Sequence, residues 1–127
     1  MKPDRKRGAV AIEFALLVPV LLMVVLGAID FGWFFFCQLS VSNAAREGAR
    51  AGTTVPNGDG AKAQTVAQAY LTSAGLGAQP TAFLVNVGAA PTTVSVEVTM
   101  TYQKLINFPP GLLPPTAHAR AVMLGVP

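Results

Sequence analysis

The sequence predicts an α+β protein in which a long N-terminal helix crosses a membrane and extends into a small exported domain. Two observations lead to this fold class. Residues 9–39 contain no Lys or Arg, and the stretch 14–29 is apolar apart from Pro19. Apolar and polar residues then alternate from Thr93 to Tyr102, which is typical of a strand with one buried face. We expect the exported domain to contain a second helix and about three antiparallel strands.

Composition separates this chain from ordinary soluble domains and from nucleic-acid-binding proteins. Its 127 residues suit one small domain, but 52% hydrophobic and 12% charged residues are too apolar for a soluble one. The net charge of +3 arises entirely in the leader, where four cations (Lys2, Arg5, Lys6 and Arg7) accompany one acid. A terminal basic cluster beside an apolar segment predicts a cytoplasmic N-terminus. It is not the basic patch on a folded domain that binding nucleic acid requires.

The apolar run has the length of a single membrane span. About 20 apolar residues cross the hydrocarbon core of a bilayer, so a span that begins near Val10 ends near Asp30. Glu13 and Asp30 then lie close to the two interfaces, where an acid costs far less than at the membrane centre. Trp33 lies just beyond, as expected of an interfacial aromatic residue. We place the end of the span at about residues 30–36.

A cleaved secretory signal is the competing interpretation of this segment. The charged start fits such a signal, and residues 26–28 offer a poor cleavage site. However, the apolar run continues through Phe36 and then becomes helical rather than loop-like. We therefore favour a membrane helix.

The helix is predicted to continue outside the membrane, over residues 9–52. A helical stripe continues at steps of three and four residues through Asp30, Phe34, Cys37, Val41, Ala45, Gly48 and Gly52. Such a helix is about 65 Å long. Pro19 is predicted to kink it, or at least to remove one backbone hydrogen bond. The small residues of its outer part are expected to allow close helix packing, in particular against the apolar face of the sheet: Ala44, Ala45, Gly48, Ala49 and Gly52.

Residues 53–127 are predicted to form the exported domain. Residues 53–60 are rich in turn formers; Asn57 to Gly60 also resembles a fragment of a calcium loop, but a plain turn is favoured because further acidic ligands are lacking. Residues 62–76 read as a helix with Asp59 as its cap. Strands are expected at 83–87, 94–102 and 116–126, the first two as a hairpin, with a proline-rich loop at 107–115.

The sequence offers no recognisable catalytic or metal-binding motif. Cys37 is the only cysteine, so it is either an apolar packing residue or forms an intermolecular disulfide. His118 is the only histidine, and the acids are scattered along the chain without forming an acid–base couple. We therefore expect no cofactor, no metal and no small-molecule substrate, and we do not expect an enzyme.

The N-terminal third resembles a known family. The stretch from Arg7 to Phe14, followed by an apolar run with Pro19, is similar to the amino terminus of type IV pilin-like proteins. The wider sequence RGAVAIEFALLVPVLLMVVLGAIDFG, followed by NAAREGARAG, resembles the TadE-like pseudopilins of the tight-adherence (Flp) pilus system. The similarity covers about 45 residues; the rest of the chain matches only in its helix-and-strand character.

This resemblance implies a processing step on the cytoplasmic face. A prepilin peptidase would remove residues 1–8 by cleaving between Gly8 and Ala9, which makes Glu13 and Phe14 the fifth and sixth residues of the mature chain. The new ammonium on Ala9 needs an anion in an apolar filament core, and a Glu13 carboxylate from the same or a neighbouring chain supplies one. The resemblance assigns no role to Asp30, for which we expect interfacial or helix packing.

The resemblance further implies a minor pilin-like subunit in a bacterial inner membrane. Its expected partners are the peptidase, other pilin and pseudopilin subunits, the inner-membrane assembly platform and the lipid bilayer. Whether the subunit enters the surface pilus is left open. One alternative is a permanently anchored envelope protein whose exported domain binds another secretion or surface component. A membrane-anchored enzyme is a second alternative, and it requires a convergent polar pocket.

Overall fold

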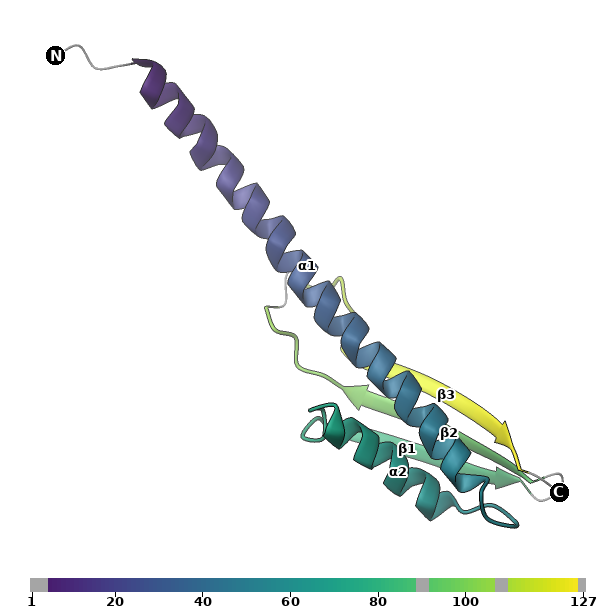
Figure 1. Cartoon of the computed structure of the whole chain (residues 1–127). Coiled ribbons are helices and arrows are strands. Elements are labelled where there is room, and N and C mark those ends of the chain that lie inside the picture. The colour runs from purple at the N-terminus through teal and green to yellow at the C-terminus, as the bar shows by residue number, and fades with distance from the viewer. Residues whose placement is uncertain (1–4, 89–91, 107–109, 126–127) are drawn as a thin grey trace.

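The computed structural model describes residues 5–88, 92–106 and 110–125. Two helices precede a three-stranded sheet: α1 at Arg5–Gly52, α2 at Gly60–Ser73, β1 at Thr81–Gly88, β2 at Thr93–Thr101 and β3 at Thr116–Leu124. The N-terminal half of α1 projects away from the rest of the molecule, while its C-terminal half lies against the sheet and α2 (Figure 1). The predicted α+β fold class is confirmed.

The two halves of α1 lie in different environments. None of residues 8–29 is buried, although nearly all are apolar, whereas buried positions recur at helical spacing from Asp30 to Gly52. By length and composition α1 is able to cross a membrane. The helix is unbroken through Pro19, where the missing N–H removes one backbone hydrogen bond without ending the helix.

A tight turn brings α2 back alongside α1. Asn57 and Gly58 have φ angles of 69° and 73°, a left-handed conformation that favours Gly and tolerates Asn. The Asp59 carboxylate accepts a hydrogen bond from Lys62 N at 3.0 Å, so the predicted N-cap is confirmed. The helix begins at Gly60 and ends at Ser73, slightly earlier at both ends than predicted.

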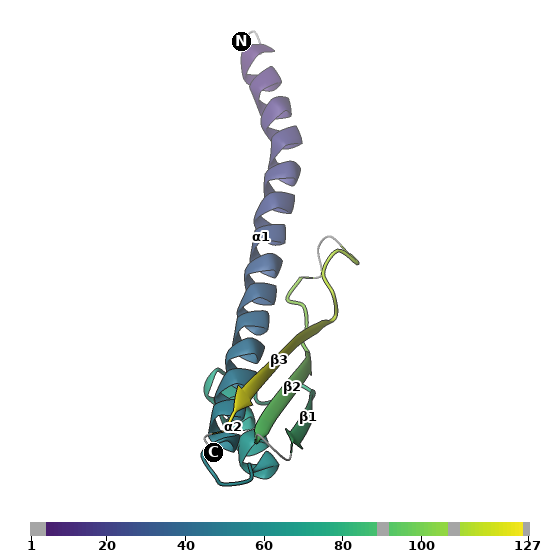
Figure 2. The same ribbon diagram turned by 90° about the vertical axis from the view of Figure 1, so that its right-hand side faces the viewer.

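The sheet is antiparallel in the order β1-β2-β3. Its register pairs Val85 with Val96 and Val96 with Ala121, so the same face is apolar in all three strands. Alternation is strictest in β2, where every second residue from Val94 to Met100 is buried. Both helices cover this face, α1 mainly over β3 and β2, and α2 over β1 (Figure 2).

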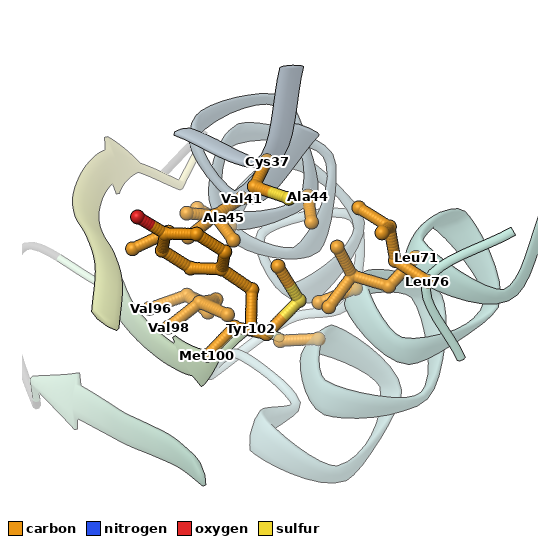
Figure 3. Packing of buried hydrophobic residues seen from close by; sticks show 14 of the residues in the cluster. Cys37, Val41, Ala44, Ala45, Leu71, Leu76, Val96, Val98, Met100 and Tyr102 are labelled. Carbon is orange, nitrogen blue, oxygen red and sulfur yellow. The ribbon is translucent and has the colours of Figure 1, made fainter. Parts of the chain in front are cut away.

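The core lies between this face and the two helices. In Figure 3 the side chains of Cys37, Val41, Ala44 and Ala45 from α1 meet those of β2 on one side and of Leu71 and Leu76 on the other. Every residue that α1 contributes to this core is Val, Cys or Ala. The helix axis can therefore lie close to its neighbours, because no larger side chain separates them.

The close approach predicted for the small residues is made to α2 as well as to the sheet. A Cβ at Gly48 would lie 2.7 Å from Ala63 O, a backbone atom of α2. A Cβ at Gly52 would lie 2.9 Å from Val94 Cγ1 and 3.1 Å from Asp59 O. The sequence-based prediction named the sheet in particular and did not name α2. That assignment was incomplete because the position of α2 depends on the 53–59 turn, which helical periodicity does not report.

The contact at Gly48 yields a prediction on stability. Gly48→Ala should lower the free energy of unfolding of the folded domain by about 1–3 kcal/mol relative to Gly32→Ala, because the backbones of α1 and α2 must move apart. Gly32 is the matched control, since it lies in the same helix with open space around its Cβ position. Replacing Gly by Ala inside a helix is favourable by about 1 kcal/mol at both positions, so this gain cancels in the comparison. Thermal unfolding of the detergent-solubilised full chain, followed by circular dichroism, gives the comparison. Equal melting temperatures for the two variants would contradict the proposed packing.

Candidate functional site

The predicted processing junction lies on the free end of α1. Lys2 lies outside the described residues, whereas the backbone of Arg5, Lys6 and Arg7 forms the first turn of α1. Gly8 and Ala9 are both exposed, and a Cβ at Gly8 would have nothing within 4 Å. The junction is therefore accessible, and it is helical rather than extended.

Glu13 and Phe14 project from the part of α1 that contacts no other element. Phe14 is 68% exposed, and Glu13 is exposed as well. In the described parts of the chain no hydrogen bond or ion pair holds the Glu13 carboxylate. Ala9 and Glu13 are four residues apart, so they lie one above the other on one face of the helix. The structure thus leaves this acid open to a group from outside the folded domain.

Asp30 has the opposite environment, although it lies in the same helix. Its residue is only 2% exposed, and its Oδ1 accepts a hydrogen bond from the backbone N–H of Ile106 at 2.9 Å. The expected interfacial or helix-packing role of this acid stays a prediction. The structure places the carboxylate against the β2–β3 connection (described at residues 102–106 and 110–115), which extends from the sheet toward the N-terminal half of α1 (Figure 2).

Three further hydrogen bonds hold the β2–β3 connection in place. The indole N–H of Trp33 donates to Gln103 O at 3.0 Å. Within the connection, the Tyr102 hydroxyl donates to Pro114 O at 2.7 Å and Lys104 Nζ donates to Leu113 O at 2.9 Å. The Tyr102 ring also packs on Phe34, with ring centroids 6.0 Å apart. Asp30 and Trp33 therefore serve the same contact, which attaches the connection to α1.

Gln38 attaches α1 to the free edge of β3 one turn further along. Its Nε2 donates to His118 O at 2.7 Å, while His118 N donates to its Oε1 at 3.3 Å. One side-chain amide thus satisfies both backbone groups of an edge residue, as a neighbouring strand would. Sequence reasoning missed this residue, because a lone Gln in a helix shows no pattern that indicates a partner 80 residues away.

Cys37 is a core residue in the structure. It is fully buried, and burial raises the pKa of its thiol, which keeps it neutral. Burial likewise raises the pKa of Tyr102, with smaller contributions from the charges of Cys37 and Asp30. Of the two interpretations of Cys37, this burial favours apolar packing over an intermolecular disulfide, since exchange requires an accessible thiolate.

The remaining ionisable pairs lie on the surface. His118 Nε2 lies 2.8 Å from Glu97 Oε1, with the His side chain 54% exposed, and Arg50 pairs with Glu47 at 2.8 Å along α1. Among the described residues, no group of three His, Cys, Asp or Glu side chains could hold a metal ion. One hollow beside α2 is lined by residues without ionisable side chains: Ala61, Gln64, Thr65 and Gln68.

Comparison with protein families addresses the same part of the chain that the sequence singled out. Residues 8–50 match the family model described as TadE-like protein. The long helix is therefore similar in sequence to the TadE-like family. The predicted resemblance is confirmed for this segment, which runs from Gly8, at the predicted processing junction, to the last turn of α1. No curated protein and no solved structure matches the chain.

The TadE-like match narrows the class of function. The family is a pilus-associated structural family, not one known for enzymes, and it suggests a Tad pilus-related function with pilus components as partners. One N-terminal apolar helix fits a single-pass membrane protein of this kind.

The hydrogen bond between Asp30 and Ile106 can be tested directly. Asp30→Ala should release the β2–β3 connection, because a hydrogen bond to a charged group contributes about 1.5–3 kcal/mol. We expect exchange of the Ile106 amide to become about 10- to 100-fold faster in hydrogen–deuterium exchange of the detergent-solubilised full chain. Asp30→Asn is the matched control, since it keeps an Oδ1 acceptor and should change exchange less. An unchanged exchange rate in Asp30→Ala would show that this contact does not hold the connection.

Proposed function

We propose that the protein is a minor pseudopilin that takes part in the assembly or initiation of a tight-adherence (Flp) pilus. The observation that best supports this is the exposed apolar half of α1, on a helix whose other half packs one side against the sheet and α2. None of residues 8–29 is buried, and their 22 residues rise about 33 Å, close to the thickness of a bilayer core. Such a surface needs lipid, or the helices of other subunits, around it.

In this proposal, subunit contacts come from residues 8–29. The small residues from Ala44 to Gly52 are engaged by α2 and the sheet of their own chain, so they are not free to receive another helix. The apolar half, by contrast, can exchange lipid for neighbouring helices at little cost, since both are equally apolar. Glu13, the one acid in this half, then makes the contact between subunits specific, since apolar side chains alone do not select one arrangement.

Charge pairing supplies the role of Glu13. After cleavage between Gly8 and Ala9, the new ammonium and the Glu13 carboxylate lie one helical turn apart. Inside a bundle of apolar helices, either charge alone is costly, whereas the pair is tolerated. A neighbour's Glu13 satisfies the ammonium equally well, and this links assembly to processing. The cationic leader keeps this end in the cytoplasm before cleavage, where the prepilin peptidase acts, and the domain from residue 53 onward is exported.

Processing gives the first test of this function. With prepilin peptidase present, the intact mass of the membrane-extracted protein should correspond to a chain that begins at Ala9. Gly8→Leu should block this step without disturbing the fold, because the Cβ position is open. Gly27→Leu, at an equally open position of the same helix, should be processed normally. Recovery of only the full-length form of the unaltered protein would instead favour the permanently anchored envelope protein.

The role of Glu13 gives the second test. Glu13→Ala should insert into the membrane but lower the yield of sheared pili by about tenfold or more, because the ammonium on Ala9 loses its anion. Glu97→Ala removes an acid from the exported sheet and serves as the matched control, with piliation expected to be normal. Immunoblots of the sheared and membrane fractions give both quantities. Normal piliation by Glu13→Ala would remove this carboxylate from the mechanism.

A further inference from the structure

We infer that the β2–β3 connection is a second membrane-contacting element, which rests in the lipid headgroup region beside the point where α1 leaves the bilayer. Its contact side chains are Leu105, Ile106 and Leu112. The inference rests on the placement of residues 8–29 in a bilayer under the proposed function. It adds a lipid-binding surface on the exported domain, outside the membrane span itself.

The connection lies at the level of the membrane surface because α1 holds it there. A span that begins near Val10 reaches the far edge of a hydrocarbon core of about 30 Å near Asp30. Ile106 N lies 2.9 Å from Asp30 Oδ1, so the backbone of the connection is fixed at that height. Figure 2 shows the chain after β2 and before β3 running along α1 toward its N-terminal half.

The connection exposes large apolar side chains although it is well anchored. Leu105, Ile106 and Leu112 are 57%, 40% and 59% exposed. Their neighbours Tyr102 and Leu113 are only 4% and 8% exposed. The exposed side chains thus lie beside buried ones in the described parts of the connection. In water this apolar area is left unburied, whereas insertion among lipid chains removes it from water.

Exposed aromatic side chains of α1 lie at the same level along the helix. Phe31, Phe35 and Phe36 are 37%, 63% and 43% exposed within about two turns of Asp30. Trp33 stacks on Phe36, with ring centroids 5.5 Å apart, while its N–H is satisfied by Gln103 O. Aromatic residues at this level are typical of a membrane interface. Continuity with the span makes lipid the expected occupant, rather than a second copy of the chain.

Charge on the connection suits the same environment. Lys104 is its only charged residue, and its ammonium is held at the connection by Leu113 O. A single cation beside exposed leucines matches a layer of anionic phosphates above apolar chains. Asp30 then acts as a positioning residue: it touches no lipid, but it holds Ile106 at the membrane surface.

A fluorescent probe at residue 112 tests this contact in the full-length protein. Leu112→Cys is labelled with an environment-sensitive maleimide dye and reconstituted at one copy per nanodisc, with a mixture of lipids brominated near the headgroup end and near the middle of their chains. The native Cys37 is buried, so the unaltered chain should take up little dye. Leu84→Cys, on the outer face of the sheet and 62% exposed, is the matched control. Val20→Cys, 58% exposed within the span, reports the span itself, and Leu105→Cys repeats the test at a second site.

We expect brominated lipid to quench the probes at residues 112, 105 and 20, and to leave the probe at residue 84 unchanged. Quenching at residue 20 with residues 112 and 105 behaving like residue 84 would overturn the inference and leave the proposed function standing. No quenching at residue 20 would overturn the membrane span, and the inference with it. A blue shift at residue 112 that appears only when several copies share a disc would identify a second chain as the occupant and likewise overturn the lipid contact.

Discussion

The structure depends on one constraint: a single continuous helix must satisfy two environments along its length. Residues 8–29 of α1 present apolar side chains on all sides, whereas the part beyond Leu39 presents small residues on one side and polar residues on the other. Between them, residues 30–39 pack one side on the domain and still expose Phe and Leu side chains on the other. A helix with an all-round apolar surface belongs in lipid or in a bundle of helices, while a one-sided helix belongs on a domain surface. The boundary between them therefore sets how far from the membrane the elements packed on α1 lie.

The core of the folded domain depends on this helix. The sheet has one apolar face, and α2 covers mainly its β1 side. The α1 residues from Cys37 to Ala49 fill the rest. At Gly48 and Gly52 the helix lies against backbone atoms of α2 and of the 53–59 turn, and against the Val94 side chain. Because one helix is both membrane anchor and core element, a force or rotation on the membrane half is transmitted to the sheet without a flexible linker. That coupling suits a subunit whose membrane half packs among other helices.

Local patterns predicted much of this arrangement, but non-local contacts lay beyond them. Alternation from Val94 to Met100 predicted β2, and small residues at helical spacing predicted the packed side of α1, because each pattern reports which face is buried. The hydrogen bond from Ile106 to Asp30 joins residues 76 apart, and a proline-rich segment has no periodicity to indicate it. The pairing of His118 with Glu97 likewise depends on the register of β2 and β3.

The two acids of the apolar helix show what sequence position alone does not report. Glu13 and Asp30 both lie near an end of the predicted span, but their environments in the fold differ. Burying an acid is tolerated only where donors meet it, and the fold supplies one at Asp30, namely the N–H of Ile106. At Glu13 the described part of the chain supplies none, and the side chain is exposed. Asp30 is thus satisfied within the subunit and attaches the β2–β3 connection to α1, whereas Glu13 is left exposed, as the proposed pairing with a processed N-terminus or another subunit requires.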